Sequence, residues 1–389
     1  MKKRLVSTIL IAAMMLSMAA SSQPAAPAET TAAAEAETTA AAAETEAPAE
    51  TEAPAETEAP AETEAAEASA DLEDSLVIYT THPEEMLEVI ADKFTEKTGV
   101  EVEFINLKGE LADRVRSEKD NPQADIMFGG DTAIYKQLQA EGCYAPTTPS
   151  WADRVEDGCK DAEGYWYGTY RTPMVLFYNS EVMTAEEAPK DWADLVKPEY
   201  KDQIVTRDSL SSSMRSTVVS LIQNITANEG EEAAWNYIQA LGENTKNYYN
   251  SGSMMFQAVG KGEAAISMAV INDVLKNRDE NAMPLEMVIP ASGAVVITDC
   301  IAATNNAPHP NAAAAFVDFV GSEECQLMTA NDFNRMPVYD SILTQCPEWM
   351  QTEFSTLPVD WNEVSANQSA WLQTWETDYL DAEKTVAKE

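Results

Sequence analysis

Four short segments rich in hydroxyl side chains or glycine come directly after apolar runs that are typical of buried strands. They are Thr80-Thr81, Gly129-Gly130, the serines Ser211 and Ser212 with their neighbours Ser209 and Ser213, and Asn250-Ser251-Gly252-Ser253. In an open α/β sheet, ligands bind beyond the carboxyl ends of the strands, where the next helix presents unpaired N–H groups. Hydroxyls add donors without adding charge, and glycine lets a ligand approach the backbone closely. We therefore expect these segments to form one cradle for a phosphate, phosphonate or carboxylate group.

Each segment also has an ordinary explanation, because Ser and Thr that precede a helix usually act as helix N-caps. In addition, Glu84, Glu85 and Asp131 stand close to the segments and would repel an anion if they pointed into the site. The recurrence of the pattern at four strand ends favours the binding interpretation.

Four single side chains are further candidates. Arg171 could grip an anionic group with two parallel hydrogen bonds, or it could form a surface ion pair. Asp299 follows the run Val295–Thr298 and could accept an ammonium group of a ligand, or it could be a buried, hydrogen-bonded carboxylate. His82 lies next to the first hydroxyl pair and within reach of a ligand there. Arg335 could also bind an anion.

The elements that would position these residues alternate between strand and helix. An apolar run at 76–79 predicts a buried strand. Pro83 and two acids after it are typical of the first turn of a helix, and apolar residues at helical spacing continue until Thr98-Gly99, where the helix is expected to end. An alternating strand follows at 100–104, and a second helix and buried strand occupy 110–117 and 124–128. Strands that alternate with helices predict an α/β fold with a mostly parallel sheet.

The first 74 residues have a different character. Residues 1–21 combine a basic start (Lys2, Lys3, Arg4) with an apolar run at 5–18, which predicts a signal peptide and export. Ser21 stands where a bacterial lipoprotein would have its lipidated cysteine, so we expect the protein at the cell surface or in the periplasm, with lipid anchoring left open. Residues 22–74 are almost entirely Ala, Thr, Glu and Pro and predict a disordered linker.

Composition limits the possible partners and chemistry. The 389-residue chain has a formal net charge of −41, which argues against a nucleic-acid partner. The cysteines, at 143, 159, 300, 325 and 346, form no metal-binding spacing, and Cys143 with Cys159 is one candidate disulfide. We expect no metal, no cofactor and no catalytic residues. With only two histidines and no GxSxG, HExxH, SxxK or P-loop pattern, few enzyme mechanisms are open.

Five segments, in this order, resemble a known family. They are VIYTTHPEEMLEVIADKFTEKTGVEVEF, PQADIMFGGD, YGTYRTPMVLFYN, GSMMFQAVGKGEAAISMAV and NRMPV. The chain resembles extracellular solute-binding proteins of bacterial ABC importers, in the branch that binds ferric ion, phosphonate, sugar phosphate and thiamine. The resemblance covers roughly residues 76–340.

The resemblance implies a type II periplasmic-binding-protein fold, in which two α/β lobes are joined by two crossing hinge strands and clamp a ligand between them. It places lobe one at 75–175 plus 290–389 and lobe two at 176–289. It also implies a monomer that delivers its solute to a membrane permease. The strand-end segments and single side chains described above supply the expected ligand-binding residues, which are Thr80, Thr81, His82, Gly129, Gly130, Arg171, Ser211, Ser212, Ser251, Gly252, Ser253 and Asp299.

The identity of the solute stays open at this point. A small phosphorylated or phosphonate anion is our first expectation, and ferric ion, thiamine and thiamine phosphate are alternatives. Ferric-ion members of the family carry adjacent tyrosines after the strand that corresponds to AAISMAVI, where this chain has Asn272-Asp273-Val274, and its pair Tyr248-Tyr249 lies earlier. Two other classes of function are an exported hydrolase that uses carboxylates, since acids are plentiful, and a surface adhesin on the Glu/Pro/Thr-rich stalk.

Overall fold

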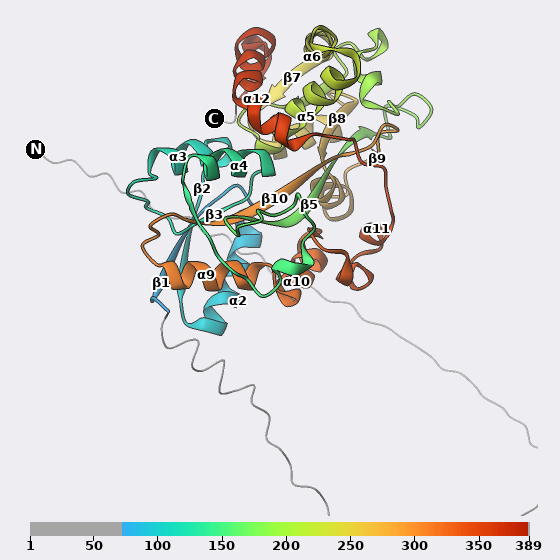
Figure 1. Ribbon diagram of the computed structural model, residues 1–389. Coiled ribbons are helices and arrows are strands. Elements are labelled where there is room, and N and C mark those ends of the chain that lie inside the picture. Colours follow the sequence, from blue (N-terminus) through green and yellow to red (C-terminus); the bar gives the residue numbers. More distant parts are fainter. Residues whose placement is uncertain (1–71, 388–389) are drawn as a thin grey trace, which may run out of the picture. The chain divides into compact units, whose positions relative to one another are not determined.

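A computed structural model describes residues 72–387 (Figure 1). The predicted signal peptide (1–21) and nearly all of the predicted linker (22–74) lie outside the described residues. Within the described part, one mixed sheet has the strand order β12-β7-β6-β8-β5-β10-β3-β1-β2, with β4, β9 and β11 paired off this path. The strands are β1 (Ser75–Thr80), β2 (Glu101–Asn106), β3 (Ile126–Phe128), β4 (Tyr144–Ala145), β5 (Tyr167–Asn179), β6 (Ile204–Arg207), β7 (Thr245–Tyr249), β8 (Ile266–Val270), β9 (Leu285–Val288), β10 (Val295–Thr304), β11 (Met336–Pro337) and β12 (Thr385–Val386).

Helices follow most of the parallel strands, as the alternating pattern predicted. They are α2 (Glu84–Thr98), α3 (Leu111–Ser117), α4 (Thr132–Ala140), α5 (Ser212–Glu229), α6 (Glu231–Asn244), α7 (Gly252–Gly260), α8 (Ile271–Leu275), α9 (Pro310–Val320), α10 (Glu323–Phe333), α11 (Glu348–Gln351) and α12 (Trp361–Thr374). Helix α2 shows how local sequence sets these elements. Two acids occupy its first turn, and Gly99 ends it with φ 79° and an N–H bond to the Thr95 carbonyl.

Two long antiparallel strands connect the two halves of the sheet. Strand β10 pairs with β3 in the first half, strand β5 pairs with β8 in the second, and the two strands pair with each other between them (Figure 1). Strands β1, β2 and β3 are parallel on one side, and β6 is parallel to β7 and β8 on the other. The mixed α/β fold with crossing strands is therefore confirmed.

Each half has its own apolar core. Phe94, Phe128 and Phe316 pack together in the first half, on helices α2 and α9 and strand β3. In the second half, Phe177 stacks on Phe256 with ring centroids 4.9 Å apart. Burial of this kind contributes about 25 cal/mol per Å² of apolar surface. Buried apolar clusters therefore lie on both sides of the strands that join the halves.

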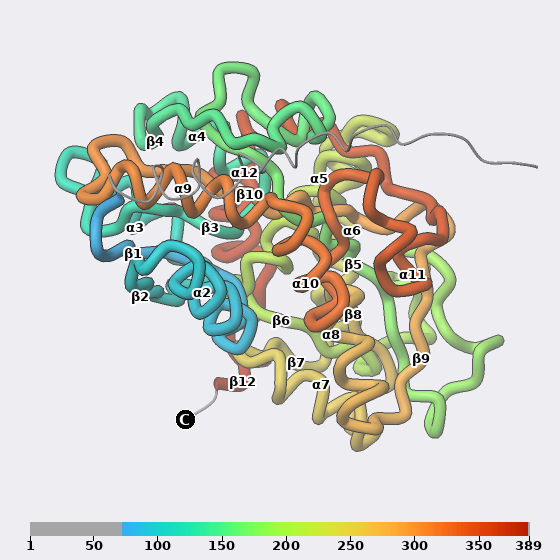
Figure 2. Tube along the Cα trace, turned by 90° about the horizontal axis from the view of Figure 1, so that it is seen from below, coloured from blue at the N-terminus to red at the C-terminus, as the bar shows by residue number. Residues whose placement is uncertain are grey.

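The C-terminal segment contacts both halves. Helix α12 packs against α4 of the first half and α5 of the second, and β12 pairs with β7 (Figure 2). The division expected from the sequence, 75–175 plus 290–389 against 176–289, stays a prediction. All five cysteines are free thiols in the described part, so the candidate Cys143–Cys159 disulfide is not formed. Within residues 72–387, the helices are too short or too polar to cross a membrane.

A buried carboxylate fixes the start of the first strand. Asp125 accepts hydrogen bonds from the backbone N–H of Val77 at 2.8 Å and of His309 at 2.7 Å, and it contacts the His309 ring at 3.0 Å. We expect Asp125→Ala to lower the free energy of unfolding by about 3 kcal/mol, because two N–H groups lose a charged acceptor. Urea denaturation checks this, with Asp120→Ala as an exposed control that changes stability by less than about 0.5 kcal/mol. Equal effects of the two substitutions would contradict the assignment.

Candidate functional site

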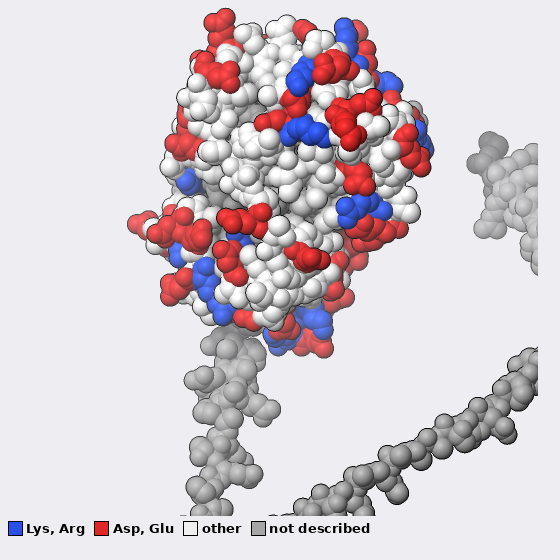
Figure 3. Space-filling model, turned by 90° about the vertical axis from the view of Figure 1, so that its right-hand side faces the viewer, with Lys and Arg blue, Asp and Glu red and all other residues white. Residues whose placement is uncertain are grey.

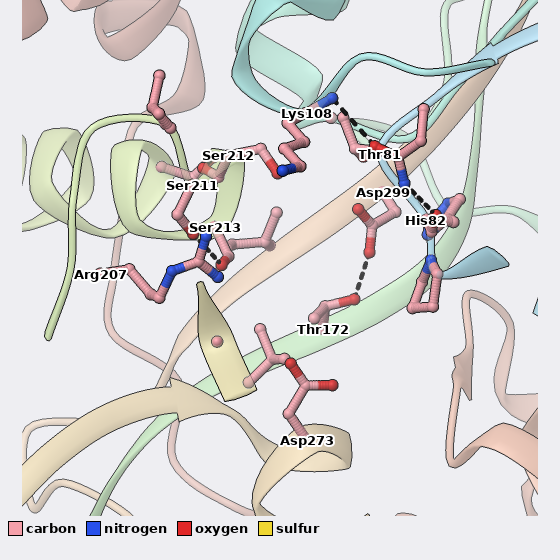
Figure 4. Close-up of a pocket in the computed structure, with 18 of the residues that line it drawn as sticks. Thr81, His82, Lys108, Thr172, Arg207, Ser211, Ser212, Ser213, Asp273 and Asp299 are labelled. Carbon is pink, nitrogen blue, oxygen red and sulfur yellow. Dashed lines mark hydrogen bonds between the residues drawn. The ribbon is translucent and has the colours of Figure 1, made fainter. Parts of the chain in front are cut away.

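A cleft of about 550 Å³ lies where the carboxyl ends of strands from both halves face one another (Figure 4). Residues from the first half, the two crossing strands and the second half all line it. The first half contributes Thr81, His82, Pro83, Asn106, Lys108 and Gly130, and the crossing strands contribute Thr172, Ile297 and Asp299. The second half contributes Arg207, Leu210, Ser211, Ser212, Ser213, Ser216, Asn250, Ser251, Gly252, Val270 and Asp273. Arg335 comes from the connection between α10 and β11. The lining is mostly polar and carries charges of both signs.

Three helix N-termini border this cleft. Ser211 is the N-cap of α5 and accepts a hydrogen bond from the Met214 N–H at 3.4 Å, and its hydroxyl lies 3.2 Å from that of Ser213. Ser251 is the N-cap of α7 but makes no side-chain capping bond, and Pro83 takes this position in α2. The first N–H groups of a helix and its dipole favour an anion. Ser211 is thus an ordinary helix cap, whereas the Ser251 hydroxyl does not cap its helix.

Three cations reach the cleft. Arg207 donates from Nε to the Tyr249 carbonyl and from Nη2 to the Asn250 carbonyl, both at 3.0 Å, which holds its guanidinium beside Gly252. Arg335 is only 7% exposed, and its Nε has no hydrogen-bond partner within residues 72–387. The Lys108 side chain extends toward Ser212 across the cleft (Figure 4). Among the described residues, none of the three cations forms an ion pair.

Two carboxylates face these cations. Burial raises the pKa of Asp299 to about 6, although the Arg335 charge and a hydrogen bond donated by Thr172 oppose this shift. The pairing of β10 with β5 is irregular between Asp299 and Cys300, as at a β-bulge, which turns a side chain out of the regular alternation. Burial also raises the pKa of Asp273, whose carboxylate accepts a 2.7 Å hydrogen bond from the Asn272 amide. Both acids could accept a bond from a cationic group of a ligand.

His82 is a neutral polar group at the wall. It is 3% exposed, and burial, aided by the charge of Arg335, holds its pKa well below the ordinary value. Its ring packs at the edge of Phe128, with centroids 4.4 Å apart, and its Nε2 has no partner in the described part of the chain. Asn106 supports this wall, since it donates to the His82 carbonyl at 2.7 Å and accepts from the Lys108 N–H at 3.1 Å.

Most of the residues expected from the sequence meet in the cleft, and four do not line it. Those that line it are Thr81, His82, Gly130, Ser211, Ser212, Ser251, Gly252 and Asp299. Thr80 and Gly129 lie behind it: the Thr80 hydroxyl accepts the His82 N–H at 3.0 Å, and a Cβ on Gly129 would collide with the Thr81 hydroxyl.

Arg171 and Ser253 lie away from the cleft. Arg171 forms an ion pair with Asp340 at 2.6 Å and donates to the Pro337 carbonyl at 2.9 Å. Ser253 is exposed on α7 and does not line the cavity. A direct contact of either residue with a solute in the cleft does not fit this arrangement, and the surface ion pair considered for Arg171 is the one observed.

The sequence analysis missed several residues of the lining, including Asn106, Lys108, Arg207 and Asp273. All four stand at or just after the carboxyl end of a strand, so the rule that selected the serines could also have found them. Thr172 and Ser216 had no such signal, because they lie inside a strand and a helix.

The raised pKa of Asp299 predicts a pH effect on stability. The folded protein holds the Asp299 proton up to about pH 6, whereas the unfolded chain releases it near pH 4, so this group stabilises the fold below about pH 4 and loses that contribution as the pH rises through 6. We expect Asp299→Asn to match the wild type near pH 4 and to be about 1 to 3 kcal/mol more stable near pH 8. Thermal or urea unfolding across this range checks it, and parallel pH profiles would contradict it.

Comparison with known proteins agrees with this geometry. The profile of a family described as bacterial extracellular solute-binding protein matches residues 121–367, more than half of the chain. A probable ABC transporter periplasmic-binding protein of Sinorhizobium fredii is 28% identical over 320 residues, which cover 79% of this chain and 87% of that protein. Iron uptake protein A1 of a Synechocystis species is 25% identical, with 63% and 71% covered.

Solved structures show the same fold. The periplasmic binding protein AfuA of Actinobacillus pleuropneumoniae, solved with fructose-6-phosphate bound, superimposes with a TM-score of 0.69 at 23% identity, covering 79% of this chain and 99% of that one. Structures of this group are two-lobed type II periplasmic binding proteins, so the fold expected from the sequence is confirmed. The family consists of solute-binding proteins rather than enzymes. The chain belongs to the bacterial extracellular solute-binding protein family.

Proposed function

We propose that this chain is the substrate-binding component of an ABC importer that takes a small solute bearing a phosphate or phosphonate group. One observation carries the proposal: Arg335 and Arg207 reach the cleft as buried or half-buried cations that form no ion pair among the described residues. A buried charge without a partner is costly, and a bound anion would supply that partner. Arginine suits a phosphonate because its planar fork matches two oxygens at once.

The N-termini of α5 and α7 border the same end of the cleft as Arg207. Their N–H groups, with the hydroxyls of Ser211, Ser212 and Ser251, add uncharged donors around the position of the anion. Thr81, His82 and Gly130 would contact the solute from the opposite half. Both halves thus contribute donors to one group, which is the arrangement that closure around a solute requires.

Ferric ion fits the described lining less well. No tyrosine lines the cleft within residues 72–387, and phenolate oxygens are the hard ligands this alternative relied on. Tyr249 packs into an apolar cluster of the second half, and Tyr248 is buried beside Gly242. The described lining of the cleft also offers thiamine no aromatic face for ring stacking, apart from the buried imidazole of His82.

Asp273 and Asp299 favour a solute that also carries an amino group. Both acids lie in the cleft and remain without ion pairs among the described residues, and their charge would repel a second anionic group. A protonated amine at this position would lower the cost of their burial. The first candidate solute is therefore a small aminophosphonate or an amino-bearing phosphate monoester.

Contacts between the halves indicate how closure would hold the solute. The Gly109 N–H donates to the Leu210 carbonyl at 3.2 Å, and Lys276 pairs with Glu85 at 2.5 Å, in each case from one half to the other. These contacts close around the cleft while β5 and β10 cross behind it. Closure removes water, which strengthens the hydrogen bonds from neutral donors to an anion.

The cellular setting follows from the relatives and the sequence. Relatives are periplasmic, and we propose that this chain is exported, acts as a monomer and delivers its solute to a membrane permease. Figure 3 shows acidic and basic side chains interspersed over one face of the described part, and no broad basic patch appears on that face. This distribution and the net charge give no support to a nucleic-acid partner.

Removal of a cleft guanidinium tests the proposed function. We expect Arg335→Met to raise the Kd for methylphosphonate or inorganic phosphate by about 30-fold or more, because truncating one partner of a buried charge pair costs about 2 kcal/mol or more. Titration calorimetry measures it, with Arg278→Met as a control whose guanidinium pairs with Asp279 outside the cleft. Unchanged affinity in Arg335→Met would contradict the proposal, and turnover of a phosphate ester by the wild type would favour the hydrolase alternative.

The amino-group assignment has its own test. We expect Asp273→Asn to weaken 2-aminoethylphosphonate about tenfold while leaving ethylphosphonate within about twofold, since only the first ligand carries an ammonium group. Parallel titrations of both ligands into wild type and variant measure this difference. A similar loss for the two ligands would mean that Asp273 acts on the site as a whole rather than on an amine.

A further inference from the structure

A second and smaller cavity adjoins the cleft. It has a volume of about 100 Å³, and it shares five lining residues with the cleft: Thr81, Lys108, Gly130, Ser212 and Ser216. On the same measure one water needs about 10 to 15 Å³, so the cavity has room for a group of several non-hydrogen atoms. We call it the side chamber. Its remaining walls come from α3 and α4 of the first half and from α5 and α12.

The side chamber differs from the cleft in its charges, because its ionic side chains other than Lys108 already have partners. Arg116 pairs with Asp113 and with Glu141, each at 2.7 Å, and Arg215 pairs with Glu376 at 2.7 Å. The buried Asp131 carboxylate accepts from the Ser216 hydroxyl and from the Ile134 N–H. Among the described residues of this lining, only Lys108, at the border with the cleft, is a cation without an ion pair, so the rest of the chamber offers no counter-ion to a charged ligand group.

Apolar side chains make up much of the rest of the wall. Leu111, Met127, Ile134 and Leu372 line the side chamber from three helices and strand β3. Atoms that face an empty space lose their van der Waals contacts on that side, and an apolar group placed there would restore them. The wall therefore favours aliphatic atoms of a ligand.

One unsatisfied polar group adds a second requirement. Gln368 on α12 is 5% exposed and lines the side chamber, and its Nε2 has no hydrogen-bond partner in the described part of the chain. An amide nitrogen only donates, so its match is an acceptor oxygen such as a hydroxyl or a carbonyl. A buried donor left without a partner costs about 1 to 3 kcal/mol, which a ligand oxygen would recover.

We propose that the side chamber is a second subsite of the same solute, for a short uncharged tail that carries one acceptor oxygen. This inference rests on the proposed function, since it assigns the anionic group to the cleft. The tail would pass between Lys108 and Ser212, whose side chains border both cavities. Lys108 has a φ of 50° and precedes Gly109, whose bond to Leu210 ties this corner to the other half, so the passage takes its form when the halves are closed.

A series of n-alkylphosphonates from methyl to butyl tests the side chamber in the full folded chain. Burying a methylene strengthens binding about fourfold, so we expect the Kd of the wild type to fall by about that factor for each added carbon until the chamber is full. Ile134→Phe and Ala112→Leu each fill the chamber from a different helix. We expect both variants to lose the gain with chain length while their Kd for methylphosphonate stays within about twofold of wild type.

Gln368→Leu tests the acceptor oxygen. The two probes, 3-hydroxypropylphosphonate and butylphosphonate, have nearly equal length. We expect the Kd of the wild type to be about fivefold or more lower for the hydroxyl-bearing probe, and we expect the variant to bind both probes with similar Kd values. Butylphosphonate is the matched control, since its tail offers no oxygen.

Thermal melting of each variant shows that it is folded before titration, and Ala112→Leu replaces Ile134→Phe if the larger ring prevents folding.

The outcomes separate the two proposals. Binding of methylphosphonate with no gain along the series, or an unchanged gain in both filled variants, overturns the side chamber and leaves the proposed function standing. Absence of binding by methylphosphonate and by inorganic phosphate overturns the proposed function, and the assignment of the chamber falls with it.

Discussion

A buried guanidinium that forms no ion pair within the described part of the chain is the constraint on which the cleft depends. Moving an arginine out of water costs several kcal/mol unless other groups compensate, and Arg335 has no ion pair and an unbonded Nε among the described residues. Its charge opposes the rise that burial causes in the pKa of Asp273 and Asp299, and it adds to the burial that lowers the pKa of His82. Burial has the largest effect on all three pKa values, and Arg335 is the one charge that acts on all three. An anion in the cleft would supply the missing partner, so the site is complete only when it is loaded.

The fold explains how such a cation can be held. Strands that run parallel in each half end at the cleft, and their helices start there, which supplies donors without further charge. The crossing strands β5 and β10 add Thr172 and Asp299, and the irregular pairing beside Asp299 lets its carboxylate reach the cavity. Each half also has buried apolar clusters of its own, and the bond from the Gly109 N–H to the Leu210 carbonyl joins the two halves beside the cleft.

Much of the fold could be predicted from the sequence, because the strand and helix periods of 76–128 are regular and end in clear signals such as Gly99. The site was harder. Arg171 and Thr172 are neighbours on β5, and their side chains lie on opposite faces, so Thr172 meets the cleft while Arg171 pairs with Asp340. Periodicity within one strand does not say which face the cleft occupies. Arg335 was a candidate from the sequence, but its place in the cleft depends on the path of the chain after α10, which the local sequence pattern does not determine.

The most direct measurement is a crystal structure of the chain with methylphosphonate bound. The account predicts the phosphonate oxygens within about 3 Å of the guanidinium groups of both Arg207 and Arg335, with N–H or hydroxyl donors of the α5 and α7 N-termini completing the shell. A phosphonate bound away from both arginines, or an Arg335 that turns to pair with Asp273 or Asp299 instead of the ligand, would contradict it.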